Sequence, residues 1–219
     1  MRLVLFGGSY ADPLHNPSDH AWMHKLVSLL GGNSAPIYYG KHVMLYSNNR
    51  PIGQHTDFGN LISYACQGCS IEYSQAQFLY YLKHEYLSSD IIIFVIPSLV
   101  RLPFIGDTFQ KEIGYGHNID YNDRDSSFIK DFEKFLYYLS DDDLKLKVDL
   151  ISTIMNGLEN KKVLLNSTDD VPSDFDFHLS GTLFELSGFD VRGSDKRSNH
   201  LSVQAALELA ERLYDFLSK

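Results

Sequence analysis

The sequence predicts an α/β protein, a three-layer α/β/α sandwich with a central parallel sheet. The first observation is a continuous apolar run from Ile91 to Ile96, which is typical of a strand buried on both faces of a parallel sheet. The second is alternation, because short apolar runs are separated by segments with apolar residues at helical spacing. Strands that alternate with helices form parallel sheets through right-handed crossovers. The 219 residues are enough for one such domain.

The elements can be placed along the chain from these patterns. Strands are expected at residues 2–6, 61–65, 91–96 and 162–166. The first helix is expected to begin at a cap, Ser18 or Asp19, and to end at Gly31-Gly32. A second helix is expected over 72–87, with an inner face formed by Phe78, Leu79, Leu82 and Tyr86. Further helices are expected over 126–139, 141–158 and 202–217, and a short helix or turn at 179–186. Residues 33–60 contain turn signals and indicate an inserted loop or short hairpin. No repeat or linker divides the chain, so residues 1–219 are expected to form a single domain.

Charge and hydropathy argue against two classes of partner. The net charge is −9 and no basic stripe is present, which argues against nucleic-acid binding through phosphates. The longest apolar run is far shorter than a membrane span, and the N-terminus has no apolar segment of signal-peptide length. We therefore expect a cytoplasmic protein without a membrane partner. The composition carries no signal for an oligomeric state.

A serine directly follows the first expected strand. Gly7-Gly8 break this strand, because glycine allows backbone angles and close approaches that other residues resist, and Ser9 comes next. Ligands of open α/β sheets bind at the carboxyl ends of the strands, so Ser9 is expected there on a turn. A serine nucleophile needs a base, and the base needs an orienting group. The polar loop before the last helix contains Asp195 and His200, which makes Ser9, His200 and Asp195 the candidate catalytic set.

Four sequence blocks resemble, in this order, the motifs of the SGNH/GDSL hydrolase family. They are Gly8-Ser9, Gly68 in Gln67-Gly68-Cys69-Ser70, Asp90 to Arg101, and Asp195 to His200. The resemblance spans the whole chain and implies an SGNH/flavodoxin-like fold. It also implies an esterase or acetylesterase that works through an acyl-enzyme without a cofactor or metal. The substrate class that the family suggests is a small-molecule or carbohydrate ester.

The resemblance also assigns oxyanion donors, which usually provide the largest catalytic contribution. The family uses the serine amide, the glycine amide of the second block and an asparagine side chain. Ser9 and Gly68 correspond to the first two donors. No asparagine directly follows the third strand, where Ser98 could donate instead. Arg101 and Asn199 are candidates for substrate binding, although Arg101 could equally form a salt bridge at the sheet edge.

The last block departs from the family in its spacing. The family typically places its aspartate three residues before the histidine, where this chain has Arg197. Asp195 lies five residues before His200, and a longer loop could still bring its carboxylate to the imidazole. Asp190 is a weaker substitute for this role.

Three other interpretations remain open. The absent asparagine allows a hydrolase-like domain that binds carbohydrate without catalysis. The segment from Gly7 to His15 resembles the opening of HxGH nucleotidyltransferases, but the next histidine is His20, so the motif is incomplete. The pair Cys66 and Cys69 follows a strand and precedes a helix, where redox dithiols lie, and no second pair completes a zinc site.

Overall fold

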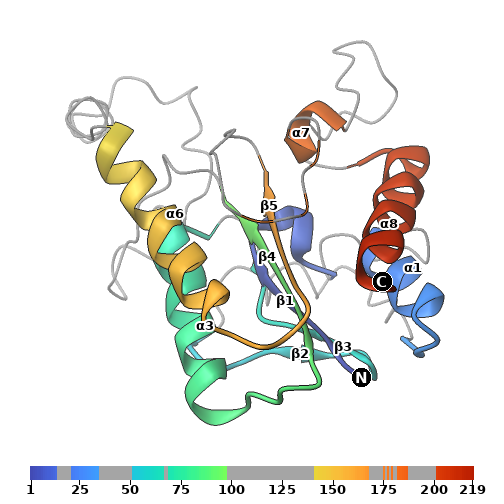
Figure 1. The fold of residues 1–219 in the computed structure, drawn as a ribbon, viewed down its shortest axis with the longest axis horizontal. Helices are drawn as coiled ribbons and strands as arrows, with labels where there is room; N and C mark the ends of the chain where they lie inside the picture. The colour runs from blue at the N-terminus through green and yellow to red at the C-terminus, as the bar shows by residue number, and fades with distance from the viewer. Residues whose placement is uncertain are drawn as a thin grey trace.

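The structure is a computed structural model that describes residues 1–13, 21–34, 51–66, 69–97, 141–167, 175, 177, 179, 182–186 and 201–219. Within these residues, five strands form one sheet in the order β2-β3-β1-β4-β5 (Figure 1). The strands are β1 (Leu3–Gly7), β2 (Thr56–Asp57), β3 (Leu61–Ser63), β4 (Ile91–Ile96) and β5 (Lys162–Asn166). β1 pairs in parallel with β3 and β4, and β4 pairs in parallel with β5. The four predicted strands are therefore confirmed as a parallel set, and the antiparallel β2 was not predicted.

The helices follow the sequence pattern with small shifts at their ends. They are the short 3-10 helix η1 (Ser9–Ala11), α1 (Trp22–Leu29), α3 (Ile71–His84), α6 (Asp141–Asn156), α7 (Leu183–Leu186) and α8 (Val203–Leu217). The N-cap of α1 is Ala21, so the prediction that Ser18 or Asp19 caps this helix is wrong. The predicted helix at 126–139 lies outside the described residues. No helix in the described ranges is both long enough and apolar enough to cross a bilayer.

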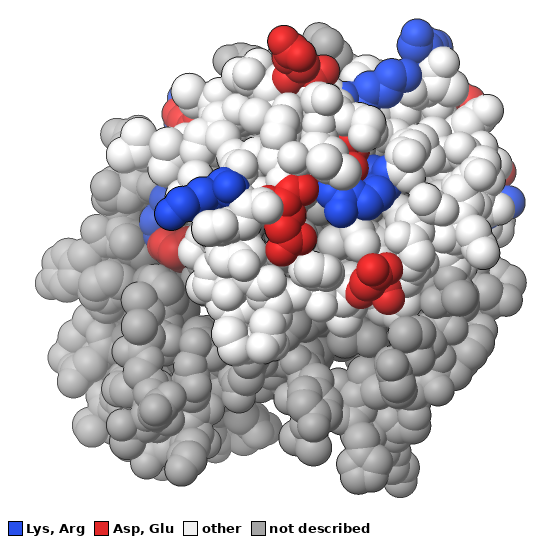
Figure 2. All heavy atoms as spheres, turned by 90° about the horizontal axis from the view of Figure 1, so that it is seen from below, with Lys and Arg blue, Asp and Glu red and all other residues white. Residues whose placement is uncertain are grey.

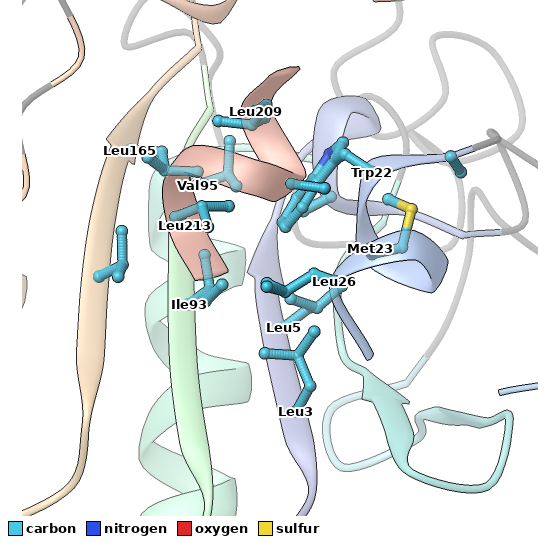
Figure 3. Close-up of a cluster of buried hydrophobic side chains, with 14 of the residues drawn as sticks. Leu3, Leu5, Trp22, Met23, Leu26, Ile93, Val95, Leu165, Leu209 and Leu213 are labelled. Carbon is cyan, nitrogen blue, oxygen red and sulfur yellow. The ribbon is translucent and has the colours of Figure 1, made fainter. Parts of the chain in front are cut away.

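The first face of the sheet packs on α1 and α8. Successive side chains of a strand point to opposite faces, so Leu3 and Leu5 of β1 share this face. Trp22 and Leu26 approach them from α1, and Leu213 approaches from α8 (Figure 3). All five side chains are buried. The apolar side of α8 therefore packs on the same face of the sheet as α1, which is far away in the sequence and also contacts α8.

The second face packs on α3 and α6 and is rich in aromatic rings. Phe6 stacks on Tyr64 with ring centroids 5.1 Å apart and meets Phe78 edge-on at 5.0 Å. Phe94 stacks on the same ring at 6.0 Å, and Met155 of α6 joins the cluster. Helices thus cover both faces of the described sheet. The prediction that Leu79 points inward is wrong, because its neighbour Phe78 fills that place and Leu79 is 51% exposed.

The strand order determines where a ligand site is expected. The chain passes from β1 to β3 on one side and then to β4 on the other side of β1. In open α/β sheets, ligands bind outside the carboxyl ends of the strands at the point where the direction of winding reverses. That point lies between the carboxyl ends of β1 and β4, where the chain continues into Gly8 and Pro97.

A partly buried ionic network lies at the opposite, amino edge of the sheet. Arg2 donates two hydrogen bonds to the Asp90 carboxylate, from Nε at 3.0 Å and from Nη2 at 2.7 Å. Tyr81 donates a third, 2.7 Å long, and Tyr64 donates one of the same length to Glu85. These bonds join the starts of β1 and β4 to the end of α3. Figure 2 shows the molecule from this side, and its described part is mostly uncharged, with a few acidic and basic side chains.

Candidate active site

Ser9 begins the tight η1 turn immediately after β1. The Ala11 amide donates to the Gly8 carbonyl at 3.0 Å, and the Asp12 amide donates to the Ser9 carbonyl at 3.3 Å. The indole nitrogen of Trp22 donates to the Tyr10 carbonyl at 2.9 Å and so fastens the turn to α1. Ser9 is 4% exposed. The predicted arrangement of strand, tight turn and serine is confirmed.

Gly7 allows this turn to form close to β4. Its φ is +123°, in a region that side chains rarely tolerate. A Cβ atom at this position would lie 1.9 Å from the Val95 carbonyl oxygen. Only glycine fits here without displacing backbone. The close pairing of β1 and β4 at the point where the chain turns toward Ser9 therefore depends on this residue.

The second sequence block is hydrogen-bonded to the end of β1. The Gly7 carbonyl accepts a bond from the Cys66 amide at 2.9 Å and lies 3.2 Å from the Cys69 thiol. The Cys69 amide also donates to the Cys66 carbonyl at 3.3 Å. Gly68 itself lies outside the described residues. The nearest described residues on either side of it, Cys66 and Cys69, lie beside Gly7 at the carboxyl end of β1. Gly7 precedes Ser9 by two residues.

Both cysteines are buried thiols that are not joined in a disulfide bond. Besides the Gly7 carbonyl, the Cys69 sulfur contacts the hydroxyl of Ser74 at 3.2 Å, and Ser74 donates to the Ser70 carbonyl at 3.2 Å. Cys69 therefore joins β1 to the first turn of α3. This arrangement gives the thiol a packing role, and the redox interpretation stays a hypothesis.

Two buried polar residues near Ser9 were missed in the sequence. Asp12 follows Ser9 by three residues and is fully buried. Ser63 is also fully buried, with its hydroxyl 3.5 Å from the Ala11 carbonyl and accepting from the Ala65 amide at 3.2 Å. Asp12 is placed beside Ser9 by its own amide, which donates to the Ser9 carbonyl at 3.3 Å. Its place in the segment that follows β1 was the available signal.

The direction of α8 bears on the Asp195–His200 loop. At the end of α8, the Leu217 carbonyl accepts a bond from Lys161, which immediately precedes β5. The end of α8 therefore lies at the amino edge, and the helix runs back along the sheet with its start toward the carboxyl edge (Figure 1). Ser202 caps this start and accepts from the Ala205 amide at 3.2 Å. The residues that directly follow the loop thus lie toward the edge that carries Ser9.

The other predicted site residues lie outside the described residues. They are Gly68, Ser98, Arg101, Asp195, Asn199 and His200. Their distances to Ser9 therefore stay predictions. Within the described ranges, no three His, Cys, Asp or Glu side chains gather as metal ligands.

The chain was also compared with known proteins. Family models, curated proteins and solved structures give no match to it.

Proposed function

We propose that the chain is a serine hydrolase of the SGNH type, a three-layer α/β/α sandwich that cleaves an ester or acetyl group. The supporting observation is the position of Ser9, on a tight turn at the carboxyl end of β1 and at the winding reversal of the sheet. In this proposal Ser9 is the nucleophile, His200 is the base and Asp195 orients the base.

The reaction proceeds in two halves. The Ser9 hydroxyl attacks the carbonyl carbon of the ester while His200 accepts its proton, and a tetrahedral intermediate forms. The amides of Ser9 and Gly68 and the hydroxyl of Ser98 donate to the oxyanion. Collapse of the intermediate breaks the ester bond, and the leaving alcohol takes the proton from His200. Water, activated by His200, then hydrolyses the acyl-enzyme and releases the acid.

Three further observations support this assignment. Cys66 and Cys69, which flank the second block's glycine in the sequence, are bonded to Gly7 and lie beside the residue pair that precedes Ser9. The start of α8, which follows the Asp195–His200 loop in the sequence, lies toward the same edge, and this supports His200 as the candidate base. The 4% exposure of Ser9 suits a small acyl group in a site that excludes water. An acetyl ester is therefore the substrate we favour.

Active-site labelling tests the proposal. The protein is treated with a fluorophosphonate, and the labelled peptide is located by mass spectrometry, alongside an assay with p-nitrophenyl acetate. We expect label on Ser9 and a fall in kcat on the order of 10³-fold or more in Ser9→Ala. Ser28→Ala changes an exposed serine of α1 and serves as the control. Label on a different serine, or unchanged turnover in Ser9→Ala, removes Ser9 as the nucleophile.

A carbohydrate-binding domain without catalysis is the second candidate. The observation that favours it is the sequence after β4, where Pro97-Ser98 replaces the expected asparagine. Tight glycan binding combined with no labelling and no turnover would favour this candidate.

A further inference from the structure

A cavity lies at the end of the sheet opposite to Ser9. It has a volume of about 230 Å³ and lies where β5 begins and α6 and α8 end. Its lining includes Lys161, Lys162, Lys219, Phe175 and Phe216. The register places the start of β5 beside the start of β4, which is the amino edge of the parallel strands. The cavity is therefore separate from the proposed hydrolase site.

The three lysines give this cavity an unbalanced positive charge. Lys161 donates to the Leu217 carbonyl, and Lys162 donates to the carbonyls of Leu158 and Asn156. An ammonium group has three N–H donors, so Lys161 and Lys162 each keep at least one donor for a ligand. In the described part of the chain, no carboxylate pairs with these two lysines or with Lys219.

The helix ends do not cancel this charge. The C-terminus of a helix carries roughly half a negative charge, so α6 and α8 together contribute about one. The three ammonium groups exceed this by about two positive charges, or by about one when the α-carboxylate of Lys219 is counted as well. In a chain of net charge −9, an excess of this kind at one cavity favours an anionic ligand.

The other walls of the cavity are aromatic. Phe175 is 4% exposed and belongs to the core on the α6 side of the sheet. Phe216 comes from α8, and its ring packs against Phe177 at a centroid distance of 5.3 Å. A cavity of about 150 Å³ holds benzene, whereas sites for drug-sized ligands begin at about 300 Å³. The observed volume therefore fits one ring or a short acyl chain with a charged group attached.

We propose that this cavity binds a small organic anion, in which a carboxylate or phosphate is attached to a single ring or a short acyl chain. The lysines bind the anionic group, and the phenyl rings of Phe175 and Phe216 contact the apolar part. The site does not depend on the hydrolase proposal, because none of its residues lies at the carboxyl edge.

Titrations of the full chain followed by NMR test this site. The probes are benzoate, phenyl phosphate, inorganic phosphate as an anion without a ring, and benzyl alcohol as a ring without charge. We expect benzoate or phenyl phosphate to shift the amide signals of Lys161, Lys162 and Leu217, with a dissociation constant near about 1 mM or lower. The stronger of these two probes identifies the anionic group. No shift at these amides up to about 10 mM, or equal binding of benzyl alcohol, overturns the proposal.

Substitutions separate the cavity from the hydrolase site. Lys219→Gln removes one charge from a side chain without a hydrogen bond in the described structure, so folding is preserved. This substitution should lower the affinity for the tighter-binding probe roughly threefold to tenfold, and added salt should lower that affinity further. Lys145→Gln on the exposed side of α6 is the matched control, and Ser9→Ala should leave the affinity unchanged. Unchanged affinity in Lys219→Gln, or shifts confined to residues around Ser9, contradicts the assignment.

Discussion

At the residue scale, the contact between Gly7 and β4 determines the path by which the chain reaches Ser9. Replacing Gly7 by alanine adds a Cβ atom 1.9 Å from the Val95 carbonyl oxygen, at a φ of +123°. Backbone strain of about 1–3 kcal/mol and overpacking of about 1–3 kcal/mol then act together. We expect Gly7→Ala to lower the free energy of unfolding, measured with urea, by about 4 kcal/mol.

Gly31→Ala is the matched control for this prediction. Gly31 also has a positive φ, +77°, but no atom lies within 4 Å of its expected Cβ. Only the backbone preference is lost there, at a cost of about 1–2 kcal/mol. An equal loss of unfolding free energy in Gly7→Ala and Gly31→Ala would show that the contact with Val95 does not constrain the pairing of β1 with β4.

Local sequence patterns predicted the turn at Ser9 but not the burial around it. An apolar run followed by two glycines specifies a strand and a turn through the backbone alone, so Ser9 could be placed. Asp12 is fully buried in the folded chain, and no local pattern encodes this burial. The inward prediction for Leu79 failed for a related reason. Adjacent apolar residues allow more than one helix orientation, and packing of Phe78 on Phe6 selects the observed one.

At the element scale, the starts of α3 and α8 were easier to predict than the short strand β2. Serine caps begin α3 and α8, both within one residue of the predicted starts. β2 has only two residues and therefore no periodicity, and its pairing with β3 is the main evidence that it is a strand. The start of α1 was misplaced because Ser18 and Asp19 are good capping residues, whereas the N-cap position belongs to Ala21.

The cap of α3 can be tested directly. The Ser70 hydroxyl accepts a bond from the Tyr73 amide at 3.3 Å, and alanine cannot replace it. Loss of such a cap typically costs about 1 kcal/mol, so we expect Ser70→Ala to lower the free energy of unfolding by that amount. Ser28→Ala, at an exposed position within α1, should change it by less than about 0.5 kcal/mol. A cost for Ser70→Ala as small as the control would show that this cap does not stabilise α3.

At the scale of the whole molecule, the two edges of the sheet have different chemistry. The carboxyl edge carries Gly7, Ser9 and the two cysteines Cys66 and Cys69. The amino edge carries the Arg2–Asp90 network and the lysine-lined cavity. The parallel arrangement was predictable because the strand segments are apolar and alternate with helices. The strand order was not, since it depends on which strands pair across long stretches of sequence. The amino-edge features were missed for the same reason, because Arg2 meets Asp90 only in the folded sheet.

The tyrosines of the amino-edge network predict how the stability of the whole molecule changes with pH. Burial is the larger cause, and the hydrogen bond to Glu85 the smaller, of a rise in the pKa of Tyr64 above its usual value of about 10. Burial and the hydrogen bond to Asp90 raise the pKa of Tyr81 in the same direction. Above about pH 10, the unfolded chain loses these protons while the folded chain keeps them. The unfolded state then binds fewer protons, so stability decreases as the pH rises.

We therefore expect the free energy of unfolding to fall between about pH 9 and pH 11, and the fall to be smaller in the Tyr64→Phe, Tyr81→Phe double variant. Urea denaturation at a series of pH values measures both slopes. The double variant should be less stable than the parent at about pH 9, because the hydrogen bonds to Glu85 and Asp90 are lost, and the difference should narrow as the pH rises. Tyr214→Phe on α8, outside this network, is the control and should keep the parent slope. An identical slope in the parent and the double variant would show that these two hydroxyls do not link folding to alkaline pH.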